Sequence, residues 1–163
     1  MNIFYLDEDP AVAAISHCDK HCVKMILETA QLLSTAHRVC DGDEYADEQG
    51  LYRATHKNHP SAIWVRETVT NYAWTYKLLT ALCAEYTARY GKVHSTERLL
   101  RALRYPPQNM GAGKFKPPPQ CMPDECKHED TVTAYRTYYL KEKIDIAEWR
   151  HSHPPKWWAW GVA

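Results

Sequence analysis

Six polar side chains recur at steps of three and four residues near the start of the chain: His17, His21, Lys24, Glu28, Gln31 and Thr35. This spacing places them on one face of a helix. Two imidazoles, an amine and a carboxylate lined up in this way are the groups that general acid–base catalysis uses. The same stripe is also typical of a solvated helix surface, and the residues alone leave both interpretations open.

Two further patterns bear on metal binding. His17 and His21 lie four residues apart, so they can converge on one ion, with Glu28 as a general base. The pattern is incomplete, because the helical zinc signature has a glutamate where this chain has a cysteine after the first histidine. A second pattern, which lacks an obvious fourth ligand, comprises Cys121, Cys126 and His128. We therefore expect no bound metal and no cofactor, and keep a metal-dependent hydrolase using His17 and His21 as an alternative.

Three segments have the composition of nucleic-acid contacts. The first precedes the proline of a helix start, where backbone N–H groups favour a phosphate, although Asn58 or His59 could simply cap the helix. The second is the most basic segment, around residues 95–104. The third is the tail WRHSHPPKWWAW, whose rings could stack on bases or pack over the core. Arg136, in the helix expected to start at Asp130, is a further candidate. The candidate nucleic-acid contacts are therefore His56, Lys57, Asn58, His59, Arg98, Arg101, Arg136, Lys156, Trp157 and Trp158.

Composition bounds the remaining possibilities. The 163 residues are 45% hydrophobic, which is enough for one compact domain over residues 1–163. Lys plus Arg equals Asp plus Glu at 20 each, so any affinity for a polyanion must come from a local patch. The N-terminus has no basic leader, and no apolar run is long enough for a membrane span. We expect a cytoplasmic monomer without membrane association, whose six cysteines are free thiols.

Hydrophobic periodicity predicts an all-α fold of about four helices, with a long acidic loop and a proline-rich connection. On the first helix, Ile15, Cys22, Ile26, Ala30 and Leu33 form the expected buried face, which Val23 and Leu27 widen. The expected segments are helices at 10–38, 60–91, 95–104 and 130–144, the acidic loop at 40–59 and the connection at 105–123.

Three stretches in the same order resemble the pyrimidine-dimer DNA glycosylases, the small all-α enzymes also called phage-type endonuclease V. DKHCVKMILE resembles that family's Asp-x-His, followed seven residues later by its catalytic glutamate, and matches it with Asp19, His21 and Glu28. NHPSAIW (58–64) is similar to an Asn-His-Pro-Ala stretch with a following tryptophan. YRTYYLKEK with PPKWWAWG looks like the last helix and the aromatic run that lies against DNA.

The resemblance implies a glycosylase with an associated lyase step, whose nucleophile is the free α-amino group of the chain. An α-amino group has an ordinary pKa near 8, about two units below lysine, so more of it is neutral at pH 7. Asn2 is bulky enough that Met1 should be retained, and Met1 should then carry this amine. If Met1 is removed, the α-amino group is that of Asn2. Glu28 takes the acid–base role, and His21 orients the amine or a phosphate.

The expected function is therefore excision of a damaged or modified base from duplex DNA through an imine. The expected catalytic residues are Met1, Asn2, His21 and Glu28, and His17 and Lys24 join the nucleic-acid contacts given above. A non-catalytic nucleic-acid-binding protein, using the basic segments and the aromatic tail, is the other alternative.

Overall fold

The structure, a computed structural model, describes residues 1–161, and all the regular secondary structure in them is helical. This confirms the all-α prediction. Eight α-helices occur in the described chain, α1 (Pro10–Ser16), α2 (Asp19–Asp41), α3 (Glu44–Glu48), α4 (Pro60–Glu67), α5 (Val69–Tyr90), α6 (Leu100–Leu103), α7 (Thr131–Glu142) and α8 (Lys156–Gly161). Two short 3₁₀ helices, η1 (Ser95–Leu99) and η2 (Asp124–Cys126), accompany them.

The helix count exceeds the expected four because two of the predicted helices are broken. The predicted helix at 10–38 divides at His17 and Cys18, whose backbones are extended. The chain is held there by the Asp19 N–H, which donates to the Glu148 carbonyl at 2.8 Å. The predicted helix at 60–91 divides at Thr68, whose hydroxyl caps α5 by accepting from the Asn71 N–H. Both breaks depend on contacts that helical periodicity does not report.

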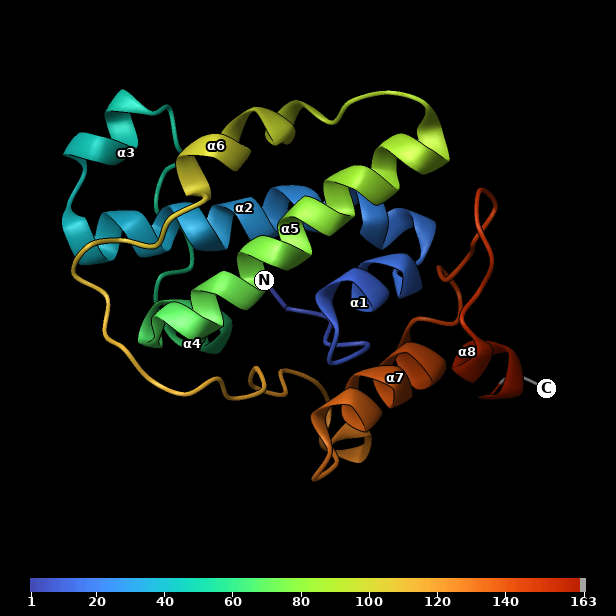
Figure 1. The fold of residues 1–163 in the computed structure, drawn as a ribbon. Coiled ribbons are helices and arrows are strands. Elements are labelled where there is room, and N and C mark those ends of the chain that lie inside the picture. The colour runs from blue at the N-terminus through green and yellow to red at the C-terminus, as the bar shows by residue number, and fades with distance from the viewer. Residues whose placement is uncertain (162–163) are drawn as a thin grey trace.

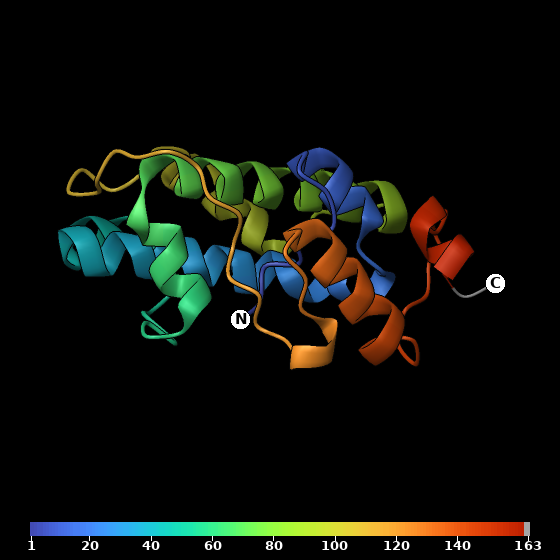
Figure 2. The ribbon, with the colours of Figure 1, turned by 90° about the horizontal axis from the view of Figure 1, so that it is seen from below.

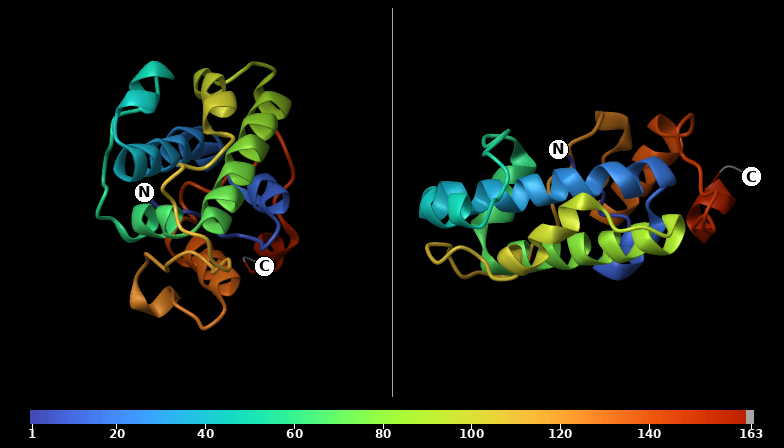
Figure 3. Two further views of the ribbon diagram at one scale, coloured as in Figure 1. Left: turned by 60° about the vertical axis from the view of Figure 1, so that its left-hand side comes forward. Right: turned by 90° about the horizontal axis from the view of Figure 1, so that it is seen from above.

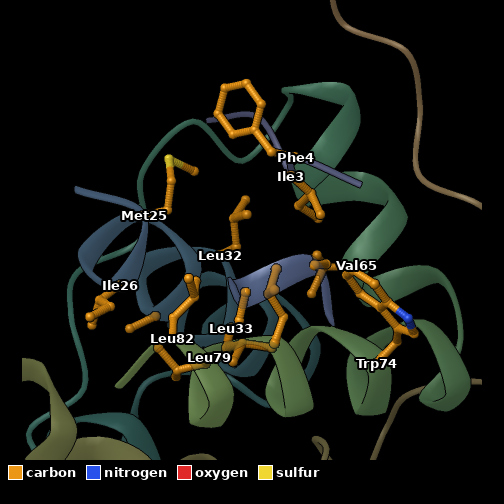
Figure 4. Packing of buried hydrophobic residues seen from close by; sticks show 14 of the residues in the cluster. Ile3, Phe4, Met25, Ile26, Leu32, Leu33, Val65, Trp74, Leu79 and Leu82 are labelled. Atoms are coloured by element: carbon orange, nitrogen blue, oxygen red, sulfur yellow. The ribbon is translucent and has the colours of Figure 1, made fainter. Parts of the chain in front are cut away.

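The long helices α2 and α5 pack against each other, and α1 and α4 pack on this pair (Figure 1, Figure 3). The segment from Ile3 to Leu6 is buried in the core, and the first residue of the chain lies beside α2 on one face of the molecule (Figure 3). Figure 4 shows Ile3 and Phe4 within the cluster that side chains of α2, α4 and α5 complete. This burial fixes the N-terminus in place.

The buried face of the first predicted helix needs a correction. Cys22, Ile26, Ala30 and Leu33 are in the core as expected, but three residues assigned to the same face lie outside it. Ile15, Val23 and Leu27 are 53%, 38% and 39% exposed. The break before α2 turns α1 independently and removes Ile15 from the face, while the other two lie at the solvent edge of α2.

The acidic loop is partly helical, because it contains α3. The N-cap residue Asp43 and the helix residue Asp47 both pair with Arg38, at 2.9 and 2.8 Å. The proline-rich connection contains no helix before η2, and its Lys116 carbonyl accepts from the Trp64 indole. All six cysteines are free thiols, as expected. None of the helices within residues 1–161 has the length and apolar character that a membrane span requires.

Candidate active site

The α-amino nitrogen of Met1 lies 3.3 Å from Oε1 of Glu28. Glu28 is near the middle of α2, and the terminus reaches it because the following residues are buried in the core. The other carboxylate oxygen, Oε2, is buried and accepts no hydrogen bond within the described residues, although the Lys24 ammonium lies 3.7 Å away. The Met1 α-amine and the Glu28 carboxylate are thus in contact through Oε1, and Oε2 accepts no hydrogen bond from residues 1–161.

Neighbouring residues hold this amine in place. The Met1 side chain is only 5% exposed, so it is packed into the protein rather than projecting from it. The Asn2 amide donates to the Cys121 carbonyl at 3.0 Å, which ties the second residue to the proline-rich connection. Removal of Met1 would empty its packing site and move the amine one residue, about 3.8 Å along the chain. The packing of Met1 and the bond of Asn2 therefore fix the position of the α-amine beside Glu28.

Met1 and Glu28 both line a hollow of about 120 Å³. Lys24 from α2 and Lys143 from the end of α7 both line it, together with His21 and Glu28. The hollow is smaller than the ~300 Å³ at which pockets for drug-sized ligands begin, so it suits a sugar-sized part of a larger substrate. The two lysines at its wall supply positive charge beside the amine, as a phosphate backbone requires.

His21 contributes a neutral imidazole to this hollow. Its ring stacks on Phe4 at 4.3 Å, and its Nδ1 lies 2.6 Å from the Tyr139 hydroxyl of α7. Burial, with the nearby positive charges of His17, Lys143 and other lysines, lowers the pKa of His21 to about 3. Burial also raises the pKa of Tyr139 well above its usual value, so it remains a phenol. Nε2 is the ring nitrogen of His21 that these contacts leave for a ligand.

The polar stripe is not a continuous solvated face, and His17 requires a correction. His17 is fully buried, and its Nδ1 lies 2.6 Å from the Ala13 carbonyl. It is the C-cap of α1 rather than a residue of α2, so it cannot touch nucleic acid as predicted. Thr35 is also buried, where its hydroxyl bonds to the backbone of Thr55. The stripe supplies the hollow only with His21, Lys24 and Glu28.

The segment before α4 lies near the amine. The His59 ring caps α4 by accepting a hydrogen bond from the Ser61 N–H. Of the two interpretations of His59 from the sequence, a phosphate contact or a helix cap, the structure shows the cap. Burial and then the positive charge of the Met1 ammonium lower the pKa of His59, so the two groups are close in space. His56, Lys57 and Asn58 are exposed beside it. These three side chains remain candidates for phosphate contacts.

The other predicted contacts lie elsewhere. Arg98 and Arg101 are exposed on η1 and α6, on the opposite side of the molecule from α7 (Figure 1, Figure 2). Arg98 donates to the Gly50 carbonyl at 3.2 Å and lies over the Tyr52 ring. These arginines can bind a backbone only if it wraps around the protein.

The aromatic tail packs largely as a structural element. Trp158 is 9% exposed and lies 5.1 Å from Trp149, so it cannot stack on a base, contrary to the prediction. Trp157 is partly buried beneath the Arg136 guanidinium, which also binds the Leu6 carbonyl and Asp7. Arg136 thus joins the first residues of the chain to α7 instead of standing free. The exposed polar and aromatic side chains of the tail are those of Arg150, His151, His153, Lys156 and Trp160, of which Trp160 is 75% exposed.

No group of three or more His, Cys, Asp or Glu side chains that could hold a metal ion occurs in the described part of the chain. His17 and His21 bond to Ala13 and Tyr139 instead. Of the second pattern, Cys126 is buried while His128 is exposed. Neither zinc pattern is therefore assembled by the fold.

Sequence reasoning missed two residues of the site. Lys143 lines the hollow, and Tyr139 holds His21, yet both come from α7, about 120 residues away in sequence. The motif YRTYYLKEK contains both residues and was the available signal, but helical spacing alone does not say which helix faces them.

In comparisons with family models, with curated proteins and with solved structures, none matches this chain. Its function must therefore be argued from the site itself.

Proposed function

We propose that the protein is a DNA glycosylase with an associated lyase activity, and that the Met1 amine attacks the sugar of a damaged or modified nucleotide. The observation that carries the proposal is the 3.3 Å contact between the Met1 nitrogen and Glu28. A buried N-terminus paired with a carboxylate in the wall of a hollow is what imine chemistry at an α-amine needs. The motif resemblance to pyrimidine-dimer glycosylases supports the same assignment.

The first step is the attack of the amine on the sugar. The Glu28 carboxylate accepts a proton from the Met1 ammonium, which frees the nitrogen lone pair. That lone pair forms a bond to C1′ while the bond from C1′ to the base breaks; the electron pair of the broken bond leaves with the base, which takes up the proton that the nitrogen then loses. The protonated Glu28 then returns a proton to the opening sugar, and the nitrogen is left as an imine.

The lyase step uses the same carboxylate. Glu28, ionised again, removes a 2′ proton, and the electrons of that C–H bond form a double bond between C2′ and C3′. The bond from C3′ to the phosphate oxygen breaks at the same time, and its electron pair leaves with the 3′ phosphate. Oε2, which accepts no hydrogen bond in the described chain and has the Lys24 ammonium 3.7 Å away, is the oxygen available for this exchange. His21, which is neutral because burial lowers its pKa, can bond to the sugar or to a phosphate but does not supply a positive charge.

Binding depends on a local field rather than on net charge. Lys24 and Lys143 line the hollow, and Lys57 lies in the exposed segment before α4. These cations would hold the phosphates on either side of a nucleotide extruded from the stack. The proposal has the protein act as a monomer in the cytoplasm on duplex DNA.

The test is borohydride trapping on duplexes that carry a pyrimidine dimer or an abasic site. The expected result is a covalent adduct located on Met1 by peptide mass spectrometry, and no adduct on undamaged duplex. If neither duplex gives an adduct, the imine mechanism is wrong. Binding of DNA without an adduct would instead support a non-catalytic nucleic-acid-binding protein, for which the exposed arginines of η1 and α6 are the observation in favour.

A further inference from the structure

Tyr139 of α7 and His21 of α2 form a buried pair, and His21 lines the hollow beside Met1 (the Met1 hollow). The Tyr139 side chain is fully buried, and its hydroxyl oxygen lies 2.6 Å from Nδ1 of His21. The His21 ring also stacks on Phe4, with 4.3 Å between the ring centroids. The stacking fixes the plane of the imidazole, and the contact with the hydroxyl fixes the orientation of the ring within that plane.

The direction of this hydrogen bond follows from the positions of the protons. Burial lowers the pKa of His21 to about 3, so the ring is neutral at pH 7 and carries one N–H proton. The separation of 2.6 Å is within the range of about 2.5–3.0 Å for an O–H donor and below the range of about 2.7–3.2 Å for an N–H donor. The Tyr139 hydroxyl therefore donates to Nδ1, and the ring proton is on Nε2.

The contacts of Tyr139 with Cys18 are compatible with this direction. The Cys18 sulfur, a competing acceptor for the phenol proton, is 3.7 Å from the hydroxyl oxygen. A thiol sulfur is a weak acceptor, and the single phenol proton cannot serve both groups. The Cys18 backbone N–H donates to the Tyr139 oxygen at 3.4 Å, which uses a lone pair and not the proton.

Nε2 of His21 is accessible, in contrast to Nε2 of His17. The His17 atom is enclosed and has no hydrogen-bond partner in the described chain, whereas His21 lines the Met1 hollow and its Nε2 is not enclosed. Lys24 and Lys143 line the same hollow, so two ammonium groups and one imidazole N–H are available there as donors. Such a set of donors suits an anionic oxygen.

We infer that Tyr139 is a positioning residue, which holds His21 so that its Nε2–H donates to a phosphate oxygen of the substrate. The inference rests on the proposed function and concerns the same hollow. The opposite charges of Met1 and Glu28 are paired at 3.3 Å, so the lysines set the sign of the field that a phosphate meets. With Nε2 protonated and Nδ1 occupied, His21 does not take a proton from the Met1 ammonium, which leaves that step to Glu28.

Spectra of ¹⁵N-histidine in the whole protein test the position of the proton without DNA. The expected result for His21 at neutral pH is a protonated Nε2 and an unprotonated Nδ1. Inorganic phosphate should shift the Nε2 resonance, whereas chloride at the same ionic strength should leave it in place. A proton on Nδ1, or an Nε2 resonance that phosphate does not move, would overturn the inference and leave the imine chemistry of Met1 unaffected.

Tyr139→Phe removes the hydroxyl and retains the ring. It should raise the protein concentration for half-maximal single-turnover cleavage of an abasic duplex about two- to tenfold, as for the loss of one neutral hydrogen bond, with the maximal rate within about twofold. Tyr135→Phe is the matched control, because Tyr135 lies one turn earlier on α7, is equally buried and donates to the Pro119 carbonyl. The control should lose similar stability and leave cleavage unchanged.

A double substitution shows whether Tyr139 acts through His21. His21→Gln retains an N–H donor near the position of Nε2 but has no ring nitrogen for the hydroxyl. Tyr139→Phe should therefore add less than about twofold in that background. A full further loss there, or equal losses in the Tyr135 and Tyr139 variants, would mean that the hydroxyl acts only through packing and would overturn the inference. The expected proton position and phosphate shift without any borohydride adduct would contradict the proposed function instead.

Discussion

Replacement of Glu28 by glutamine separates its chemical role from its structural one. The variant keeps the shape and one acceptor oxygen but removes the charge 3.3 Å from the Met1 nitrogen. Two unit charges at that distance attract by about 1.3 kcal/mol in bulk water and about 5 kcal/mol at an effective permittivity of 20. Because both groups lose water on folding, we expect the free energy of unfolding to fall by only about 1–3 kcal/mol.

The effect on turnover should be larger than the effect on stability. Loss of a positioned acid–base group costs about 10²–10⁴ in rate, or about 3–5 kcal/mol in activation free energy. DNA affinity should stay within about threefold, because the proposed phosphate contacts are made by lysines rather than by Glu28. The assay is single-turnover cleavage of a duplex with one abasic site, with anisotropy for affinity and urea unfolding for stability.

Glu129→Gln is the control, since this carboxylate is exposed and does not line the Met1 hollow. It should match the native protein in all three measurements. If Glu28→Gln folds, binds the duplex and cleaves it within about tenfold of the native rate, Glu28 is not the acid–base group and the reasoning fails.

Three further predictions concern the N-terminus, the two lysines of the Met1 hollow and the buried histidines His17 and His21. A Gly-Ser extension before Met1 should abolish borohydride trapping, because it moves the amine away from Glu28; undiminished trapping would place the nucleophile elsewhere. Lys24→Ala and Lys143→Ala should each weaken binding to duplex DNA and lower the slope of log affinity against log salt by about 0.9, and an unchanged slope would remove that lysine from the DNA interface. The pKa values of His17 (about 4) and His21 (about 3) lie below the ordinary 6.5, so the unfolded chain binds more protons between these limits. Unfolding free energy should therefore be fully present above pH 6.5 and fall as the pH drops toward 4, by up to about 1.4 kcal/mol per unit for each histidine; urea titrations with a flat profile would contradict their burial.

Local sequence patterns predict the helices, whereas the positions at which the structure differs from the prediction depend on contacts between residues far apart in sequence. Asp130, expected at the start of the last long helix, caps α7 through its side chain, and Gly91 ends α5 in a left-handed conformation. Local signals suffice for such ends. The break at His17 has no local signal, because it depends on the Glu148 carbonyl 129 residues beyond Asp19.

The sequence predicts those residues of the candidate site that lie on a single helix, α2. His21, Lys24 and Glu28 share a face by spacing alone, and the structure places all three at one hollow. Spacing could not show that His17, at the same period, is buried by the turn between α1 and α2. Nor could it show that the tail tryptophans pack on one another, since the same rings suit both a core and a base stack.

Zero net charge does not exclude a polyanionic substrate here, because the charges are separated along α2. Lys20, Lys24 and Lys143 all act on His21 at one part of the molecule, where they lower its pKa. At the other end of the helix, Glu44 and Glu48 face a hollow whose wall contains no cation within residues 1–161. A phosphate backbone is attracted to the first kind of region and repelled from the second, so in the proposed function this charge separation would orient DNA toward the Met1 amine. The zero net charge sums all 20 basic and all 20 acidic residues of the chain, and only the fold shows that these two regions are apart.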